Sequence, residues 1–374
     1  MPQFVKWRKI PDLPLPILST CNLLQSTDML AIQMLRREIG RFYCGSVGPC
    51  QIRYINTLWQ HQVPDGSRVM SNKFTIASDF SSSNDLTIKR GDCLPFLKSL
   101  PASIAQLVVT SPPYNVGKEY ELRQSLDDYL DFQDKVISEC ERVVQPGGSI
   151  CWQVGSHFDT RGCLVPLDAV LYPLFSRHKR LFLRNRIVWQ YGHGLHCRNR
   201  FSGRHEMILW FTKGAEYVFN LDSVRVPQKY PGKTAYKGQN RGLPSGHPLG
   251  KNPGDVWNIP NVVGNHTEKT EHPCQFPIAL VETLILALTN EQDLVIDPFL
   301  GAGTTAVAAL MNGRRAAGAD ITAKYVHIAR ARVKELENGK LAYRSRSKPV
   351  LDPVPNTKLT TPPNGFLSNG CHSS

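Results

Sequence analysis

The sequence predicts an α/β fold with a mostly parallel sheet and an antiparallel hairpin at one edge of the sheet. Three observations lead to this fold class. A buried strand, a glycine turn and a helix follow one another within residues 294–311. Strand-like and helix-like segments alternate between residues 86 and 154, and two further strand-like segments, 187–189 and 207–211, are joined by a loop rich in glycine and arginine. Alternating segments of this kind indicate a parallel wound sheet.

The individual segments carry the signals expected of such a fold. Residues 86–92 read as a strand that ends in an acid, and 94–100 as a short helix. Ser125 is a helix N-cap, and apolar residues then recur with helical period until Pro146. We expect the helix to end at this proline and its two following glycines, and 149–154 to form the next strand.

The glycine turn has the features of a cofactor site. Residues 294–296 form a strand that ends at Asp297, and Gly301 and Gly303 precede the helix. A second strand of small residues ends at Asp320, which is 320 − 297 = 23 residues further on. This is close to the ~20 residues after which a second strand presents its ribose-binding acid. A tight turn without a ligand is the alternative interpretation.

The residues around the turn favour one kind of cofactor. No lysine follows the last glycine, and Ala306 stands where a third glycine would be, so the common phosphate-binding patterns are not matched. An acid directly before the turn disfavours phosphates and suits an ammonium or sulfonium group. S-adenosylmethionine carries both of these charges, a ribose diol for Asp320 and a carboxylate for the helix N-terminus.

A second motif lies nearly two hundred residues upstream. The apolar strand at 107–110 runs directly into Ser111, Pro112, Pro113 and Tyr114. The two prolines fix the backbone, so Ser111 and Tyr114 are expected to project from the carboxyl end of the strand.

With Phe299-Leu300-Gly301-Ala302-Gly303, this motif resembles those of the DNA amino-methyltransferases, [DNS]-P-P-[YFW] and F-x-G-x-G. Because the proline motif comes first, the order is that of the β group. The resemblance covers about residues 85–341. It implies a Rossmann-like, S-adenosylmethionine-dependent methyltransferase fold with a circularly permuted motif order, in an enzyme of restriction-modification type. It assigns a catalytic role to Ser111, Pro112, Pro113 and Tyr114, and cofactor binding to Asp297, Phe299, Gly301, Gly303, Thr304, Asp320, Asp92 and His272.

Two of these assignments have further grounds or alternatives. Asp92 is placed near the adenine or ribose edge by the resemblance, but local sequence fits a helix-capping aspartate equally well. His272 belongs to a His-Pro-x-x-x-Pro segment that, in the family, packs against the methionine end of the cofactor. Cys274 follows a proline, as does the nucleophile of cytosine-C5 methyltransferases, but it precedes the cofactor turn and leads into an amphipathic helix, so we do not expect it to be a nucleophile.

The mechanism expected from the resemblance is direct transfer. Ser111 Oγ and the Pro112 carbonyl would accept the two amino hydrogens of a flipped base, and Tyr114 would stack on its ring. Serine at the first motif position goes mostly with N4 of cytosine in this family, so we expect N4 of cytosine to be the methylated atom. N6 of adenine is the alternative. An RNA methyltransferase and a non-catalytic DNA-binding module are the readings from other classes.

Composition adds an expected partner. The formal net charge is +13 and the pI about 9.3, which favours a polyanionic partner, although charge alone fits a solubility bias equally well. Cations interleaved with tyrosine and phenylalanine are dense between residues 177 and 251. We therefore expect double-stranded DNA as the partner, with a target-recognition insert at about 213–262, and the resemblance implies a cognate restriction endonuclease.

Other expectations concern metals, thiols and boundaries. His193, His196, Cys197 and His205 match no common zinc spacing, so no metal site is predicted. The ten cysteines include no C-x-x-C pair, which indicates reduced thiols. Residues 1–84 are interpreted as an N-terminal extension of unknown role, 85–340 as the methyltransferase domain and 341–374 as a disordered tail. No membrane span or signal peptide is predicted, and a cytoplasmic location is expected.

Overall fold

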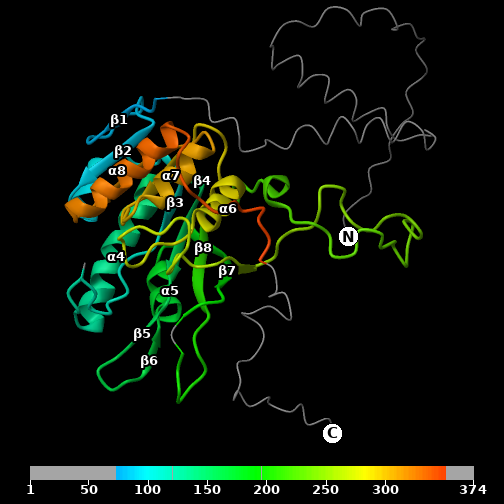
Figure 1. Ribbon diagram of the computed structural model, residues 1–374, viewed down its shortest axis with the longest axis horizontal. Helices are drawn as coiled ribbons and strands as arrows, with labels where there is room; N and C mark the ends of the chain where they lie inside the picture. Colours follow the sequence, from blue (N-terminus) through cyan, green and yellow to red (C-terminus); the bar gives the residue numbers. More distant parts are fainter. Residues whose placement is uncertain (1–72, 120, 195, 351–374) are drawn as a thin grey trace, which may run out of the picture. The chain divides into compact units, whose positions relative to one another are not determined.

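The computed structural model describes residues 73–119, 121–194 and 196–350 (Figure 1). All of these belong to one compact unit. The predictions for the N-terminal extension up to residue 72 and for the tail from residue 351 lie outside the described residues. Residues 341–350 are described, and the Arg344 N–H donates a hydrogen bond to Glu268 Oε1 at 3.1 Å.

The core of the unit is a mixed sheet, as predicted. Its nine strands include a parallel block from β1 to β4, followed by β8, which is antiparallel to both of its neighbours. A separate two-stranded sheet joins β5 (Ser156–Phe158) to β6 (Leu164–Pro166). In spatial order the strands of the large sheet are β1 (Ile76–Ala77), β2 (Leu86–Arg90), β11 (Arg315–Asp320), β10 (Leu294–Asp297), β3 (Ala105–Thr110), β4 (Val144–Val154), β8 (His205–Lys213), β7 (Leu181–Gln190) and β9 (Val256–Asn258).

Helices cover both faces of this sheet (Figure 1). Successive residues of a strand point to opposite faces, so Leu107 and Val108 belong to different hydrophobic clusters. One cluster contains α6 (Ile278–Leu288), α7 (Thr304–Met311) and α8 (Ala323–Glu337), and the 3-10 helix η1 (Leu221–Val224) contributes to it. The other contains α3 (Cys93–Ser99), α4 (Leu126–Val143) and α5 (Leu167–Arg177).

The predicted start of the helix at residue 126 is confirmed, but the chain after its end differs from the prediction. Ser125 caps α4, because its Oγ accepts a hydrogen bond from the Asp128 N–H at 3.1 Å. However, β4 begins at Val144, so Pro146 and its two glycines lie within the strand instead of in a loop. The pairing of β3 with β4 shifts register between Ala105 and Leu107. A strand irregularity of this kind accommodates proline, which sequence alone reads as a terminator.

The edge beyond the hairpin contains a strand that was not predicted. β9 pairs in parallel with β7, in the register Val188 with Val256 and Trp189 with Trp257. The Trp189 indole N–H donates to the Ile259 carbonyl at 2.8 Å, which holds the chain after β9 against β7. β9 has only three residues and no alternation to mark it, so no sequence signal distinguished it from a loop.

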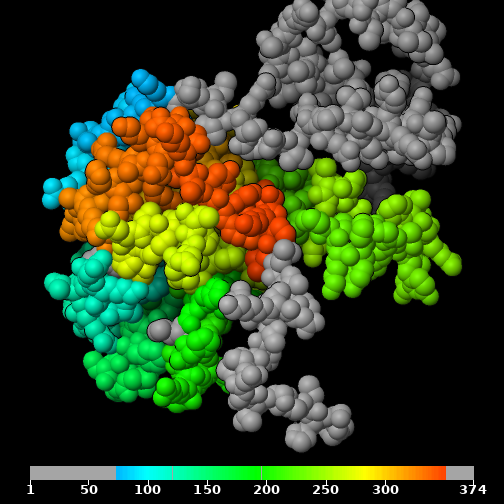
Figure 2. Space-filling model, viewed as in Figure 1, coloured from blue at the N-terminus to red at the C-terminus, as the bar shows by residue number. Residues whose placement is uncertain are grey.

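Between η1 and β9 the chain is a long, loop-rich insert. The described residues there form only isolated bridges, such as Val226 with Lys251, and in Figures 1 and 2 this yellow-green stretch extends away from the sheet. Six described cysteines are free, and Cys93, Cys140 and Cys151 of these are buried. None of the described helices has the length and apolar character needed to cross a membrane.

Candidate active site

The strand register brings the two motifs to the same edge of the sheet. β10 and β3 are parallel neighbours, with Val295 opposite Leu107 and Ile296 opposite Val108. The carboxyl ends of the two strands therefore meet, and the loops that follow them begin side by side. Tyr114 and Phe299 both pack against the hydrophobic cluster of α3, α4 and α5, so they lie on the same face of the sheet.

The Asp297 carboxylate joins the two motifs. It is fully buried and accepts hydrogen bonds from the Thr110 and Thr305 hydroxyls, each at 2.6 Å, and from the Phe299 N–H at 3.1 Å. Burial raises the pKa of Asp297 to about 6, although these donors act in the opposite direction. Thr110 is the residue directly before Ser111, so this carboxylate fixes the end of β3 to the start of the glycine turn.

The glycine turn has a conformation that requires glycine. Gly301 and Gly303 have φ of +50° and +74°. A Cβ on Gly303 would lie 2.6 Å from the Ala329 Cβ, so α8 can approach the turn only at a glycine. Thr304 Oγ1 accepts a hydrogen bond from Arg332 Nη1 at 3.0 Å, and the same nitrogen donates to the Ala302 carbonyl at 2.8 Å. Sequence reasoning missed this contact from α8.

Asp320 and Asp92 lie at the ends of neighbouring strands, at the same edge. Asp320 accepts the Gly301 N–H at 3.0 Å and the Thr322 N–H at 2.7 Å, and burial raises its pKa. The Gly91 N–H donates to the Asp320 carbonyl at 3.0 Å, which places Asp92 beside it. Asp92 also caps α3 by accepting the Leu94 N–H at 2.8 Å. The capping interpretation of Asp92 therefore holds without excluding a place beside the cofactor.

His272 lies against the glycine turn. A Cβ on Gly301 would be 3.0 Å from its Nε2, and its ring centroid is 4.3 Å from that of Tyr325 in α8. His272 Nδ1 accepts the Cys274 N–H at 3.2 Å, so the hydrogen of a neutral ring sits on Nε2, which faces the turn. Burial, together with nearby Lys269, lowers the pKa of His272 to about 4, so the ring is neutral at physiological pH.

The segment after the proline motif reaches across to the same region. The Lys118 ammonium donates to Cys274 Sγ at 2.7 Å, and Glu119 accepts the Tyr325 hydroxyl at 2.8 Å. Glu121 accepts the N–H groups of Asn115 and Val116, each at 2.9 Å. The chain that follows Tyr114 is thus connected both to α8 and to the segment that carries His272.

The proline motif itself is held by residues from other elements. Ser111 Oγ lies 3.2 Å from the Tyr114 hydroxyl. The Tyr129 hydroxyl of α4 donates to the Pro113 carbonyl at 3.0 Å, and His157 Nδ1 lies 2.9 Å from the Tyr114 carbonyl oxygen. A Cβ on Gly155 would be 3.0 Å from Tyr114 Cε2, so a glycine after β4 lets the Tyr114 ring pack closely.

Glu206 completes this arrangement and was not recognised from the sequence. It accepts the Tyr114 hydroxyl at 3.0 Å and the Tyr191 hydroxyl at 3.5 Å, and the Gln153 amide donates to it. Burial raises the pKa of Glu206, and burial beside this acid raises the pKa of Tyr114 as well. An acid at the start of a strand carries no distinctive sequence signal. Only the pairing of β4 with β8 brings it to Tyr114.

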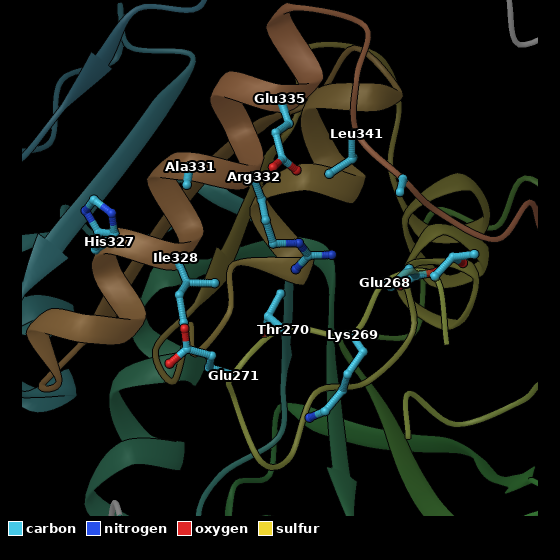
Figure 3. Close-up of a pocket in the computed structure, with 12 residues that line it drawn as sticks. Glu268, Lys269, Thr270, Glu271, His327, Ile328, Ala331, Arg332, Glu335 and Leu341 are labelled. Carbon is cyan, nitrogen blue, oxygen red and sulfur yellow. The ribbon is translucent and has the colours of Figure 1, made fainter. Parts of the chain in front are cut away.

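Two cavities lie elsewhere. One, of about 500 Å³, is bounded by segment 267–271 and by α8, and in Figure 3 Arg332 reaches from α8 towards Thr270. Arg332 is 4% exposed and its Nη2 has no hydrogen-bond partner among the described residues. The other, of about 350 Å³, lies between β7, β9 and α6. Neither is lined by the proline motif.

The segment from His193 to His205 contains three histidines and one cysteine. In the described part of the chain, no group of three or more histidine, cysteine, aspartate or glutamate side chains could hold a metal ion. His196 Nδ1 instead lies 3.5 Å from an Arg204 guanidinium nitrogen.

The loop between β7 and β8 combines aromatic and cationic side chains at this same edge of the sheet. Phe201 is 99% exposed, and the Arg200 guanidinium lies 4.8 Å from the ring centre of Phe158. In the insert, Tyr236 is 84% exposed. Exposed aromatic rings beside cations suit contact with a nucleic acid.

Known proteins resemble this chain over its central part. A family model described as DNA methylase matches residues 105–331. A relative from Bacillus subtilis, "Type II methyltransferase M.BglII", is 48% identical over 254 residues, 68% of this chain and 70% of the relative. "DNA adenine methyltransferase YhdJ" from Escherichia coli (strain K12) is 32% identical over 71% of this chain and 92% of its own.

Among solved structures, "PVUII DNA METHYLTRANSFERASE (CYTOSINE-N4-SPECIFIC)" has the same fold, with a TM-score of 0.55 at 19% identity over 72% of this chain and 95% of that one. The order of the two motifs, the adjoining loops that carry them and the extent of the family match all support the same assignment. The chain belongs to the N6/N4 DNA methylase family and is an S-adenosylmethionine-dependent DNA methyltransferase of restriction-modification type.

Proposed function

We propose that this enzyme methylates N4 of cytosine, at a specific sequence in double-stranded DNA, by base flipping and direct transfer. The choice of base rests on Ser111 at the first position of the proline motif, because serine at that position goes mostly with N4 of cytosine in the family that the motif resembles. Its hydroxyl lies 3.2 Å from the Tyr114 hydroxyl and next to the end of β3, which is held by Asp297. A neutral hydroxyl in a fixed position can accept a hydrogen from a neutral exocyclic amine.

The reaction needs an amine whose lone pair is directed at the methyl group. In cytosine this lone pair is delocalised into the ring, which makes the amine a weak nucleophile. Ser111 Oγ and the Pro112 carbonyl would accept its two hydrogens, which localises the lone pair and orients it. Tyr114 would stack on the flipped base, because its hydroxyl and backbone are both held by neighbouring residues.

The residues around the glycine turn fit the cofactor by the chemistry of their donors. Asp320 would bind the ribose diol, Asp92 would lie at the adenine or ribose edge, and the turn from Gly301 to Thr304 would hold the methionine part beside His272. Phe299 and Asp297 would also hold the cofactor on this side of the turn. The bound cofactor supplies the electrophilic methyl group. A neutral His272 adds no positive charge against its sulfonium.

The DNA would lie on the cationic segments. We propose that the insert at about 213–262 reads the target sequence, and that the loop between β7 and β8 contacts the backbone near the flipped base. The insert contains Lys229, Lys233, Lys237 and Arg241, all exposed. Their positive charges would neutralise phosphates of the DNA backbone. The activity would be cytoplasmic, and a restriction endonuclease of the same specificity is the expected partner enzyme.

Methylation of adenine N6 is the second candidate, supported by the 32% identity with a DNA adenine methyltransferase. An RNA methyltransferase or a non-catalytic DNA-binding module has no specific observation in its favour. The test is incubation of the full chain with labelled cofactor and long unmethylated DNA, followed by nucleoside analysis. N4-methylcytosine alone supports the proposal, and N6-methyladenine alone overturns the choice of base.

A further inference from the structure

We propose that Glu206 takes up the proton that the target amine loses on methylation, through a relay formed by Ser111 and Tyr114. The proposal rests on the proposed function in that the substrate is an exocyclic amine, but it is the same for cytosine and adenine. Ser111 and Tyr114 belong to the predicted motif. Glu206 is 92 residues from Tyr114 in sequence and lies outside both motifs.

The hydrogen bonds form a continuous chain. Ser111 Oγ is 3.2 Å from the Tyr114 hydroxyl, which donates to Glu206 Oε2 at 3.0 Å. A phenol has one hydrogen, so a Tyr114 that donates to Glu206 cannot also donate to Ser111. Ser111 must then donate to Tyr114. Its remaining lone pairs are left to accept a hydrogen from the amine, which is the role that positioning the substrate requires.

Two hydrogen-bond donors orient Glu206 besides Tyr114. The Gln153 amide of β4 and the Tyr191 hydroxyl at the end of β7 both donate to it. The positive charge of Lys118 acts to lower the pKa of Glu206, and the positive charge of Arg204 acts to lower the pKa of Tyr191. Burial raises the pKa of Glu206 above that of an ordinary glutamate, so its carboxylate holds a proton more strongly than an exposed one would.

The step balances in atoms and charge. A bond forms between the amine nitrogen and the methyl carbon, while the bond from that carbon to sulfur breaks and its electron pair stays on sulfur. The nitrogen, now positively charged, releases a proton to Ser111 Oγ. The Ser111 hydrogen passes to Tyr114 Oη, and the Tyr114 hydrogen passes to Glu206. The carboxylate becomes a neutral acid, which returns the proton to water between turnovers.

Glu206 is therefore a positioning residue that also accepts a proton through Tyr114, and its exchange for glutamine tests this role. Glu206→Gln keeps the size of the side chain and an oxygen that can accept the Tyr114 hydroxyl, but it cannot take up a proton. We expect the single-turnover rate of methyl transfer to fall about 100-fold. Binding of S-adenosylmethionine and of long unmethylated DNA should change less than about twofold.

The dependence of rate on pH separates a relay from a merely structural contact. In the wild type the rate should rise with pH as Glu206 loses its proton and then level off. In Glu206→Gln the rate should no longer rise with pH, so this rising limb of the profile should disappear. Glu206→Asp should recover part of the rate and the rising limb. Glu291→Gln is the matched control, because Glu291 is an exposed glutamate in the turn that precedes β10, at the opposite end of that strand from Asp297. It should keep both the rate and the limb.

Two results would overturn the relay. One is a Glu206→Gln enzyme with nearly the wild-type rate and an unchanged pH profile, which would leave Glu206 only a contact of Tyr114. The other is a loss of rate explained by weaker cofactor or DNA binding. Failure of the proposed function is distinguishable, because it appears in the wild type as methylation of another base or as no transfer to DNA.

Discussion

The turn after β10 and the loop after β3 begin side by side, but different kinds of contact hold them. The turn is held by residues 2 to 30 positions from the groups they contact: Asp297 binds Phe299 and Thr305, Asp320 accepts the Gly301 N–H, and Arg332 donates to the Ala302 carbonyl. The loop is held by Tyr129, His157 and Glu206, which are 16, 43 and 92 residues from the groups they contact. The contacts that hold the cofactor turn thus come mostly from the segment between β10 and α8, whereas those that hold the base side come from α4, β5 and β8.

Substitution of Ser111 tests the separation of the two sides most strongly. In Ser111→Ala the amine loses its acceptor, so transfer should fall by about 1,000-fold or more. Cofactor binding should be unchanged, because the contacts of the turn do not include Ser111. Single-turnover methylation and calorimetric titration of S-adenosylmethionine measure the two effects. Loss of both together would show that Ser111 is structural.

Asp297 links the two sides through its hydrogen bonds to Thr110 and Thr305, and its ionisation should affect stability. Its pKa is raised from 3.8 to about 6, so the folded state binds its proton more tightly than the unfolded state does. Its contribution to stability is therefore present below about pH 4 and is lost as pH rises through 6, by about 3 kcal/mol in all. Urea unfolding of the wild type and Asp297→Asn at pH 4.5 and 7 measures it. Equal pH dependence in both proteins would contradict the assignment.

Gly303 tests how closely the turn depends on α8. Gly303→Ala would place a Cβ 2.6 Å from that of Ala329, whereas Gly313→Ala, at a similar φ of +70°, meets nothing within 4 Å. Both substitutions carry the strain of a positive φ, so their difference isolates the packing clash. We expect Gly303→Ala to lower the free energy of unfolding by about 2 kcal/mol more than Gly313→Ala. Equal losses would show that α8 moves to accept the methyl group.

The smallest effect is expected in the insert, outside both sides. Replacement of Lys229, Lys233 and Lys237 by glutamine should weaken DNA binding about tenfold and reduce the slope of log affinity against log salt by about 2 to 3. The same three-charge change at Lys89, Lys98 and Lys135, in β2, α3 and α4, is the control. Fluorescence anisotropy across a salt series measures both. Equal slopes for the two variants would remove the insert from the DNA contact.

The agreement between sequence and structure follows the same division. The strand, the acid and the positive-φ glycines of the cofactor turn were predictable, because each signal comes from a few adjacent residues. The prediction of a loop at Pro146 was wrong. In the sequence, a proline that ends a helix cannot be told from one near the start of an irregular strand until the strand pairing is known. Arg332 was also missed, because an arginine in an amphipathic helix usually reads as exposed, and this one is 4% exposed.

By itself, the sequence determined the α/β class, the permuted order of the motifs, the glycine turn with its two acids and the serine-proline-proline-tyrosine loop. These rest on local periodicity and on residue types whose backbone preferences are strong. Only the tertiary structure decided that Asp297 ties the two loops together and that Glu206 stands behind Tyr114. The second depends on the antiparallel register that pairs Val154 with Met207, and register between distant strands is set by the packing of the entire sheet.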